Sequence, residues 1–333
     1  MTWMNRGTAE LMMMLAAAAA SLSCGGSTSD TLGAGGAGGG SGSGGSGGQQ
    51  HAHPSCRTDY LGAGMDCSTG RDCCETTDIP GGRFNRRNDP SLPASVGAFR
   101  ADVFEVTTGR FRGFVDAWPG SKPKSGTGGH PKVTGTEWQA EWDADHLPAT
   151  SEELLTALGT DSIYITCDIW KAGIEDGRIP ASCMTWYEAF AFCTWEGGRL
   201  PTEAEWQFMA VGGDEQRINP WGNEPYDRTR AVYREDPEGG LAAAGSRPAG
   251  VGRWGVLDLG GSRIEWALDR GELGRTPPVP CTDCVDLLDK RIRVDLDNSY
   301  AQETESAAEA RPIYQTVDAR AAPQGLRCVY DVP

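Results

Sequence analysis

The chain has few histidines, few basic residues for its acidity, and no hydrophobic run long enough to span a membrane. Four histidines in 333 residues leave little for histidine catalysis or a histidine-rich metal site. Lys and Arg number 30 against 46 Asp and Glu, and the net charge of −16 gives no positive surface for nucleic acid or an anionic bilayer. The length allows one large domain or two small ones.

The longest apolar run, Leu11–Leu22, has the length of a signal-peptide core and is too short to cross a bilayer. Small residues precede Cys24 in the run Ser21-Leu22-Ser23-Cys24, and the segment resembles a bacterial lipoprotein signal, in which that cysteine becomes the lipidated first residue. We therefore expect residues 1–24 to be a lipoprotein-type signal peptide, with cleavage without lipidation as the alternative. Gly25, where an aspartate would favour inner-membrane retention, favours the outer membrane, on its periplasmic or cell-surface side.

Residues 25–54 consist mainly of Gly, Ser, Ala and Gln without periodicity. Such a segment cannot bury apolar surface and is predicted to be a flexible coil. Roughly thirty residues of this composition reach about 30 Å, which suits a tether between a lipid anchor and a folded domain. The lipid anchor would be the only contact with a membrane.

The cysteines indicate an oxidising compartment. Once Cys24 is set aside, ten cysteines remain behind the export signal, and an even number there predicts up to five disulfides. The Cys281-Thr-Asp-Cys284 spacing is compatible with zinc, but zinc needs two further ligands, so a local disulfide is favoured. Cys73 and Cys74 are adjacent and are expected to have separate partners.

Short elements punctuated by glycine and proline predict a loop-rich α+β domain. Three helices are expected from Thr-x-x-Glu capping boxes, and a fourth from Thr107 or Thr108 through Val115. The boxes are Thr150–Glu153, Thr185–Glu188 and Thr202–Glu205. Strands are predicted at residues 100–105, 162–166, 291–296 and 325–329. Ten of the eleven tryptophans lie between Trp118 and Trp266 and are expected to anchor the core.

The run Gly197–Trp206, GGRLPTEAEW, resembles the signature of the formylglycine-generating enzyme family, the sulfatase-modifying factors. Further segments are similar to other parts of the family and follow in its order: Ile79–Phe84, Phe104–Thr108, Met184–Cys193, Pro220–Asn223, Trp254–Trp266 and Gly325–Cys328. The resemblance covers residues 78–333, after a Cys-rich N-terminal segment at 55–77. It implies the family's C-type-lectin-like α+β fold, which has little regular secondary structure.

The resemblance also implies a disulfide between Cys193 and Cys328. Such a bond would close a loop of about 135 residues and contribute about 4 kcal/mol or more on the chain-entropy estimate. Further pairs are expected between Cys167 and Cys183 and within the Cys281–Cys284 segment. The four cysteines Cys56, Cys67, Cys73 and Cys74 are expected to pair among themselves, with their connectivity left open.

A calcium site is expected at the turn between Asp258 and Glu265. These carboxylates flank a Gly-rich turn, and hard oxygen ligands in a loop suit Ca²⁺, although spacing alone fits two solvated carboxylates better. The resemblance implies ligation by the side chains of Asp258 and Glu265 and by the carbonyl groups of Gly261 and Arg263.

The match fails at the catalytic positions. Enzymes of the family use O₂ and a copper ion held by two cysteines to oxidise a sulfatase cysteine to formylglycine, and copper(I) prefers such soft thiolate ligands. The segment 293–300 resembles the one that precedes this pair. The two positions themselves hold Gln302 and Ala307, so no catalytic residue is assigned and copper is not expected.

Two functions follow from this pattern. The first is a non-catalytic binding or structural module, in which a loop-built, Trp-lined pocket takes an unknown protein, peptide or glycan ligand. The alternative is a copper- and O₂-dependent oxidoreductase of the formylglycine-generating type with relocated ligands. No nucleic-acid partner is expected for either.

Overall fold

The computed structural model describes residues 53–160, 167–171, 176–233, 242–271, 276–288, 292–296, 312–316, 318–320 and 323–333. These residues belong to one unit, His51–Pro333. The expected signal peptide, nearly all of the linker and the predicted strand at 162–166 lie outside the described residues. Within the described part of the chain, no helix is long and apolar enough to cross a membrane.

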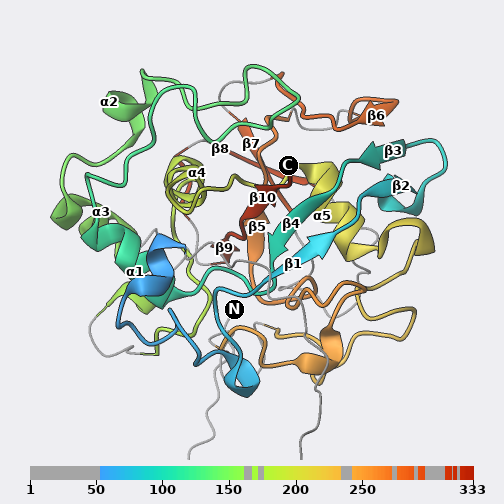
Figure 1. Ribbon diagram of the computed structural model, residues 1–333, viewed down its shortest axis with the longest axis horizontal. Coiled ribbons are helices and arrows are strands. Elements are labelled where there is room, and N and C mark those ends of the chain that lie inside the picture. Colours follow the sequence, from blue (N-terminus) through green and yellow to red (C-terminus); the bar gives the residue numbers. More distant parts are fainter. Residues whose placement is uncertain are drawn as a thin grey trace, which may run out of the picture. The chain divides into compact units, whose positions relative to one another are not determined.

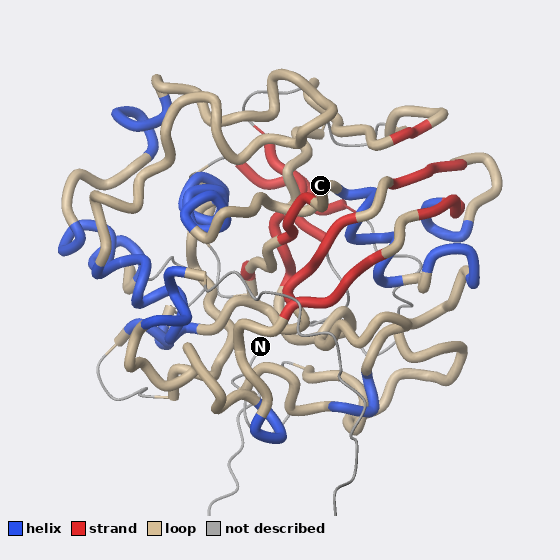
Figure 2. The backbone as a smooth tube through the Cα atoms, viewed as in Figure 1, coloured by secondary structure: helices blue, strands red, loops and turns tan. Residues whose placement is uncertain are grey.

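The described strands form three small sheets (Figures 1 and 2). One is antiparallel, in the order β1 (Thr76–Ile79), β4 (Phe99–Asp102) and β10 (Val329–Asp331). A second contains β2 (Gly82–Asn85), β3 (Pro93–Val96) and β6 (Cys281–Thr282). The third has the order β8 (Pro312–Thr316), β7 (Ile292–Leu296), β5 (Ile264–Trp266) and β9 (Gln324–Gly325).

The described helices are short, and all but one begin where the capping residues predict; the exception, Trp142–His146, has no side-chain cap and was not predicted. They are α1 (Thr108–Asp116), α2 (Trp142–His146), α3 (Ser151–Leu158), α4 (Trp186–Trp195) and α5 (Glu203–Ala210). Complete capping boxes at Thr150, Thr185 and Thr202 confirm three predicted starts, and Thr107 caps α1. Single turns of 3-10 helix lie at Pro54–Arg57, Ser68–Gly70, Arg86–Asn88, Asp168–Trp170, Gly213–Glu215 and Pro248–Gly250.

The predicted strand boundaries were less accurate. The expected strand at 100–105 begins one residue earlier and ends at Asp102. The expected strand at 325–329 is two strands in different sheets, β9 and β10, because the chain crosses from the third sheet to the first between them. The predicted strand at 291–296 is present as β7.

The core lies on both sides of β10, which α4 and α5 flank in Figure 1. Cys328 and Tyr330 belong to the cluster that contains α4, whereas Val329 belongs to the cluster that contains α5. Because successive side chains of a strand point to opposite faces, β10 contributes to both hydrophobic clusters. The buried tryptophans confirm their predicted role in the core: Trp118, Trp138, Trp142, Trp170, Trp186, Trp206 and Trp266.

All ten cysteines of the domain form disulfides, in the pairs Cys56–Cys74, Cys67–Cys73, Cys167–Cys183, Cys193–Cys328 and Cys281–Cys284. The first two pairs resolve the connectivity that the sequence left open. The Cys193–Cys328 bond joins α4 to the residue before β10. The N-terminal segment is also held by hydrogen bonds from Ser55 to Glu196 at the end of α4.

Candidate functional site

The predicted calcium turn folds tightly in front of β5. Asp258, Gly261 and Ser262 have left-handed backbone conformations, with φ of 60°, 76° and 61°. This geometry brings Asp258 back towards Gly245, whose N–H donates to Asp258 Oδ2 at 2.6 Å. Glu265 follows on β5 and is fully buried. The four predicted residues of this site therefore lie on one turn and the strand that leaves it.

Arg327, from the closing Gly325–Cys328 motif, supplies a cation to the turn. Its guanidinium donates to both carboxylate oxygens of Glu265 at 2.8–3.1 Å, and the side chains of both residues are almost completely buried. The remaining N–H groups donate to the carbonyl oxygens of Asp102, Val103 and Leu257. Trp206 of α5 donates a further hydrogen bond to Glu265, at 2.9 Å.

Glu105 is a third buried carboxylate at this turn, and no motif in the sequence assigned it a role. It accepts hydrogen bonds from the Ser262 hydroxyl at 2.5 Å and from the Arg263 N–H at 2.9 Å. A charged residue within the apolar run 103–106 was the signal that could have identified it. Burial, together with the charges of Asp258 and Glu265, raises the pKa of Glu105 well above its usual value.

Burial also raises the pKa of Asp258, to about 6, and the charge of Glu265 adds to the effect. Three carboxylates thus lie near one guanidinium, which pairs directly with Glu265, and the raised pKa values of the other two favour their protonated forms.

As placed, these side chains do not form a calcium cage. Both oxygens of Glu265 and both oxygens of Glu105 already accept protein hydrogen bonds. Among the described residues, no group of three or more His, Cys, Asp or Glu side chains is arranged to hold a metal ion. A calcium ion at Glu265 would have to displace Arg327, whose charge already balances that carboxylate.

The positions of the family's copper-binding cysteines, Gln302 and Ala307, lie outside the described residues. Strand β7 ends at Leu296, a few residues before them.

The signature run forms a second charged centre at the start of α5. Gly197 has a left-handed φ of +83°, and Gly198 lies so close to β10 that a Cβ atom there would be 2.5 Å from the Val329 carbonyl oxygen. The close approach places Arg199 against Glu205, to which it donates two hydrogen bonds of 2.7 Å. Arg199 also donates to Asp331 at 3.0 Å.

The Arg199–Glu205 pair is almost fully buried, with side-chain exposures of 2% and 4%. Burial alone would raise the pKa of Glu205, but the adjacent Arg199 charge and the capping hydrogen bond from Thr202 lower it overall. Glu205 therefore stays ionised, and it both caps α5 and fixes Arg199.

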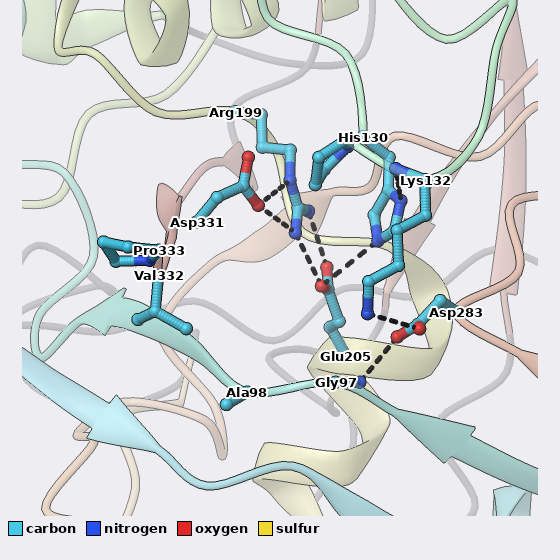
Figure 3. A pocket seen from close by; sticks show the side chains of 11 residues that line it. Gly97, Ala98, His130, Lys132, Arg199, Glu205, Asp283, Asp331, Val332 and Pro333 are labelled. Carbon is cyan, nitrogen blue, oxygen red and sulfur yellow. Dashed lines mark hydrogen bonds and ion pairs between the residues drawn. The ribbon is translucent and has the colours of Figure 1, made fainter.

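The pair forms one wall of a pocket of about 340 Å³ (Figure 3). His130 and Lys132 line it from the loop before α2, and Asp283 lines it from the segment between the disulfide-bonded Cys281 and Cys284. The remaining lining residues are Gly97, Ala98, Pro131, Asp331, Val332 and Pro333. None of the residues lining this cavity is a tryptophan, and the fold uses most of its tryptophans in the core, so a Trp-lined pocket stays a prediction.

Comparisons with known proteins give the same family as the sequence motifs. The sequence model of the sulfatase-modifying factor enzyme 1-like domain matches residues 65–332. The chain is 29% identical over 223 residues to the inactive C-alpha-formylglycine-generating enzyme 2 of Mus musculus, covering 56% of this chain and 66% of that protein. It is 28% identical over 225 residues to the formylglycine-generating enzyme of Thermomonospora curvata, covering 57% and 70%.

Among solved structures, PvdO from Pseudomonas aeruginosa is similar at a TM-score of 0.52 and 18% identity, over 78% of this chain and 95% of that one. This similarity shows the fold alone, and together with the family match it confirms the predicted fold class. Because the curated relatives include an inactive protein and an active enzyme, the fold does not decide activity. The chain belongs to the sulfatase-modifying factor enzyme 1-like domain family.

Proposed function

We propose that this protein is an exported, lipid-anchored member of the family that acts as a non-catalytic binding or structural module. The observation that carries the proposal is the state of the cysteines. The family positions hold Gln302 and Ala307, and all ten cysteines of the domain are paired in disulfides. A disulfide sulfur is not a thiolate, so the domain offers copper(I) no thiolate ligand of the kind that the family uses.

The same observation weighs against relocated copper ligands. Cys281 and Cys284 are the pair nearest in sequence to the family positions, and they are bonded to each other. The only other cysteine, Cys24, belongs to the expected lipidation site. An oxidoreductase of the formylglycine-generating type would have to open a disulfide before it could bind copper.

The test is a peptide oxidation assay. The purified, oxidised protein is incubated with copper, O₂ and a sulfatase-type Cys-x-Pro-x-Arg peptide, and the peptide mass is followed for conversion of cysteine to the aldehyde. The Thermomonospora curvata enzyme serves as the positive control. We expect no aldehyde from this protein, and turnover would contradict the proposal and favour the oxidoreductase alternative.

The export part of the proposal has its own test. Lipidation at Cys24 would give a membrane-bound protein whose mature N-terminal peptide carries fatty acyl chains in mass spectrometry. A Cys24→Ser variant is expected to be released from the membrane fraction. An unmodified N-terminus after cleavage would support export without an anchor.

Calcium stays a prediction of the family resemblance. If it binds at the Asp258–Glu265 turn, the melting temperature will fall in the presence of a chelator, and Asp258→Ala will abolish that response. A melting temperature indifferent to both would leave Arg327 as the cation of the turn.

A further inference from the structure

The acids in the pocket beside the Arg199–Glu205 pair are each paired with a basic side chain (Figure 3). Arg199 binds both Glu205 and Asp331, and Lys132 Nζ lies 2.7 Å from Asp283 Oδ2. The three acids exceed the two bases by one charge, which disfavours anionic ligands. A cationic ligand would meet the charges of Lys132 and Arg199 beside each rim carboxylate that it could bind, which disfavours it as well.

The pocket nevertheless presents polar groups with unused hydrogen-bonding capacity. His130 Nδ1 accepts a hydrogen bond from the Lys132 N–H at 3.2 Å, which assigns the ring proton to Nε2. Nε2 lies 3.8 Å from Glu205 Oε1, which is longer than a hydrogen bond, and the side chain is 3% exposed. Burial and the nearby Arg199 lower the pKa of His130, so the ring is a neutral donor.

Asp283 and Asp331 form the rim of the pocket and supply hydrogen-bond acceptors to complement the His130 donor. The carboxylates of Asp283 and Asp331 are paired but have lone pairs beyond those that Lys132 and Arg199 occupy. A ligand that fits must therefore accept a hydrogen bond at the His130 side and donate at the rim. A hydroxyl group does both without carrying charge.

One side of the pocket is apolar, and its residues are Ala98, Pro131, Val332 and Pro333. The volume of about 340 Å³ is near the lower end of the range of about 300–1,000 Å³ for ligand pockets. A sugar ring matches this lining because it combines a C–H face with hydroxyl groups around its edge.

Covalent and hydrogen bonds hold Asp283 in place at the rim. Asp283 lies between the disulfide-bonded Cys281 and Cys284 and has a left-handed φ of 45°. Its N–H donates to the Ser95 carbonyl at 2.9 Å, and its Oδ1 accepts from the Gly97 N–H at 2.5 Å. A non-glycine residue held in this conformation is typical of sites whose geometry is preorganised, and preorganisation lowers the entropic cost of binding.

We propose that this pocket binds a neutral, polyhydroxylated ligand, a sugar ring, and that the Cys281–Cys284 disulfide preorganises its rim. The proposal rests on the binding function proposed above and names the ligand class for it. It uses the buried His130 donor, the paired acids and the apolar side of one cavity.

The test uses three sugars that share a ring and differ in charge. The full chain is titrated with N-acetylglucosamine, glucosamine and glucuronate, and binding is followed by saturation-transfer NMR. We expect saturable binding of the neutral ring, and binding of the two charged rings weaker by about tenfold or more. The proposal would be overturned if no saturation transfer to N-acetylglucosamine were seen at millimolar concentrations, or if either charged sugar bound more tightly. Binding of a small neutral peptide amide instead of the sugar would also overturn it.

Two variants locate the binding. Ala98 is exposed at the pocket, so Ala98→Trp is expected to fill the cavity and abolish transfer, whereas Ile218→Trp, at an exposed position outside the lining residues, is expected to leave it unchanged. Unchanged binding in Ala98→Trp would contradict the pocket assignment.

The double variant Cys281→Ser/Cys284→Ser tests the rim, with the near-ultraviolet circular dichroism of its tryptophans as a check that the fold persists. We expect its affinity for N-acetylglucosamine to fall by about tenfold. Affinity equal to that of the unaltered chain would contradict the role of the disulfide. If no sugar binds and the peptide assay gives no aldehyde, the pocket proposal fails and the proposed function stands. The two are distinguishable because only aldehyde formation tests the proposed function.

Discussion

Arg327 donates to five oxygen atoms: both carboxylate oxygens of Glu265 and the carbonyl oxygens of Asp102, Val103 and Leu257. Its partners lie between 62 and 225 positions away in the sequence, so no local pattern could have predicted the set. The family resemblance included Arg327 in its closing motif but assigned it no partner. The sequence identified two of the three carboxylates at the turn, Asp258 and Glu265, and gave no role to Glu105 or to the Arg327 cation.

Removing that cation is expected to destabilise the fold strongly. Arg327→Met leaves Glu265 buried without a counter-charge, and breaking a buried pair typically costs about 3–5 kcal/mol in the free energy of unfolding. Urea denaturation measures the loss. Arg253→Met, which breaks an exposed pair with Asp214, serves as the control and should change stability little. A similar, small effect of both variants would contradict this account of the turn.

The buried carboxyl group of Asp269 predicts how the stability of the fold depends on pH. Asp269 accepts hydrogen bonds from the N–H groups of Glu203 and Asp286, and burial, with the charge of Glu203, raises its pKa from 3.8 to about 8. A carboxyl whose pKa is higher in the folded state binds its proton more tightly there. Its contribution to stability is complete below about 4 and is lost as the pH rises towards 8.

We therefore expect the free energy of unfolding to fall between pH 4 and pH 8, and Asp269→Asn to flatten this slope. Asparagine keeps only one acceptor for the two N–H groups, so the variant should also be less stable at every pH. Denaturant titrations at a series of pH values compare the slopes. Parallel curves for the two proteins would show that Asp269 does not carry the dependence.

At the scale of elements, all the described helices except α2 were predicted, whereas most strands were not. A capping box is a local pattern, so the starts of α3, α4 and α5 could be identified from four residues each. The strands are two to five residues long and pair across large separations, as β3 does with β6. Such short runs carry almost no periodicity, and their position depends on contacts that the sequence does not display.

Thr150 and Thr202 form the same capping box, one on an exposed helix and one on a buried helix, so the effects of replacing them can be compared. Thr202→Ala is expected to lower stability by about 1–2 kcal/mol, because the buried cap positions Glu205 against Arg199. Thr150→Ala removes the same motif at an exposed helix and should cost less. Thermal unfolding of both variants gives the comparison, and a larger loss for Thr150→Ala would contradict the importance of the signature pair.

At the scale of the whole molecule, one disulfide connects distant parts of the chain. Cys193 and Cys328 are 135 residues apart, whereas Cys281 and Cys284 are three apart. The resemblance implied the first pair, and the structure shows why it matters, because the bond joins α4 to the strand that lies between both hydrophobic clusters.

Replacing both members of each pair with serine tests this difference. The loss of the Cys193–Cys328 bond is expected to cost about 4–5 kcal/mol, and the loss of the Cys281–Cys284 bond about 2 kcal/mol, since a longer closed loop constrains the unfolded chain more. Chemical denaturation of the two double variants supplies the values. Equal losses would show that local strain, rather than loop closure, determines the effect.

The central claim is that this chain has the family fold but lacks the family's copper ligands. A copper(I) competition titration tests this claim most directly. The unaltered, oxidised chain is compared with the variant Gln302→Cys/Ala307→Cys, which restores thiols at the family positions. We predict that the variant takes up one copper(I) ion from the competing chelator and that the unaltered chain takes up none. Copper(I) binding by the unaltered chain as tight as that of the variant would contradict the account.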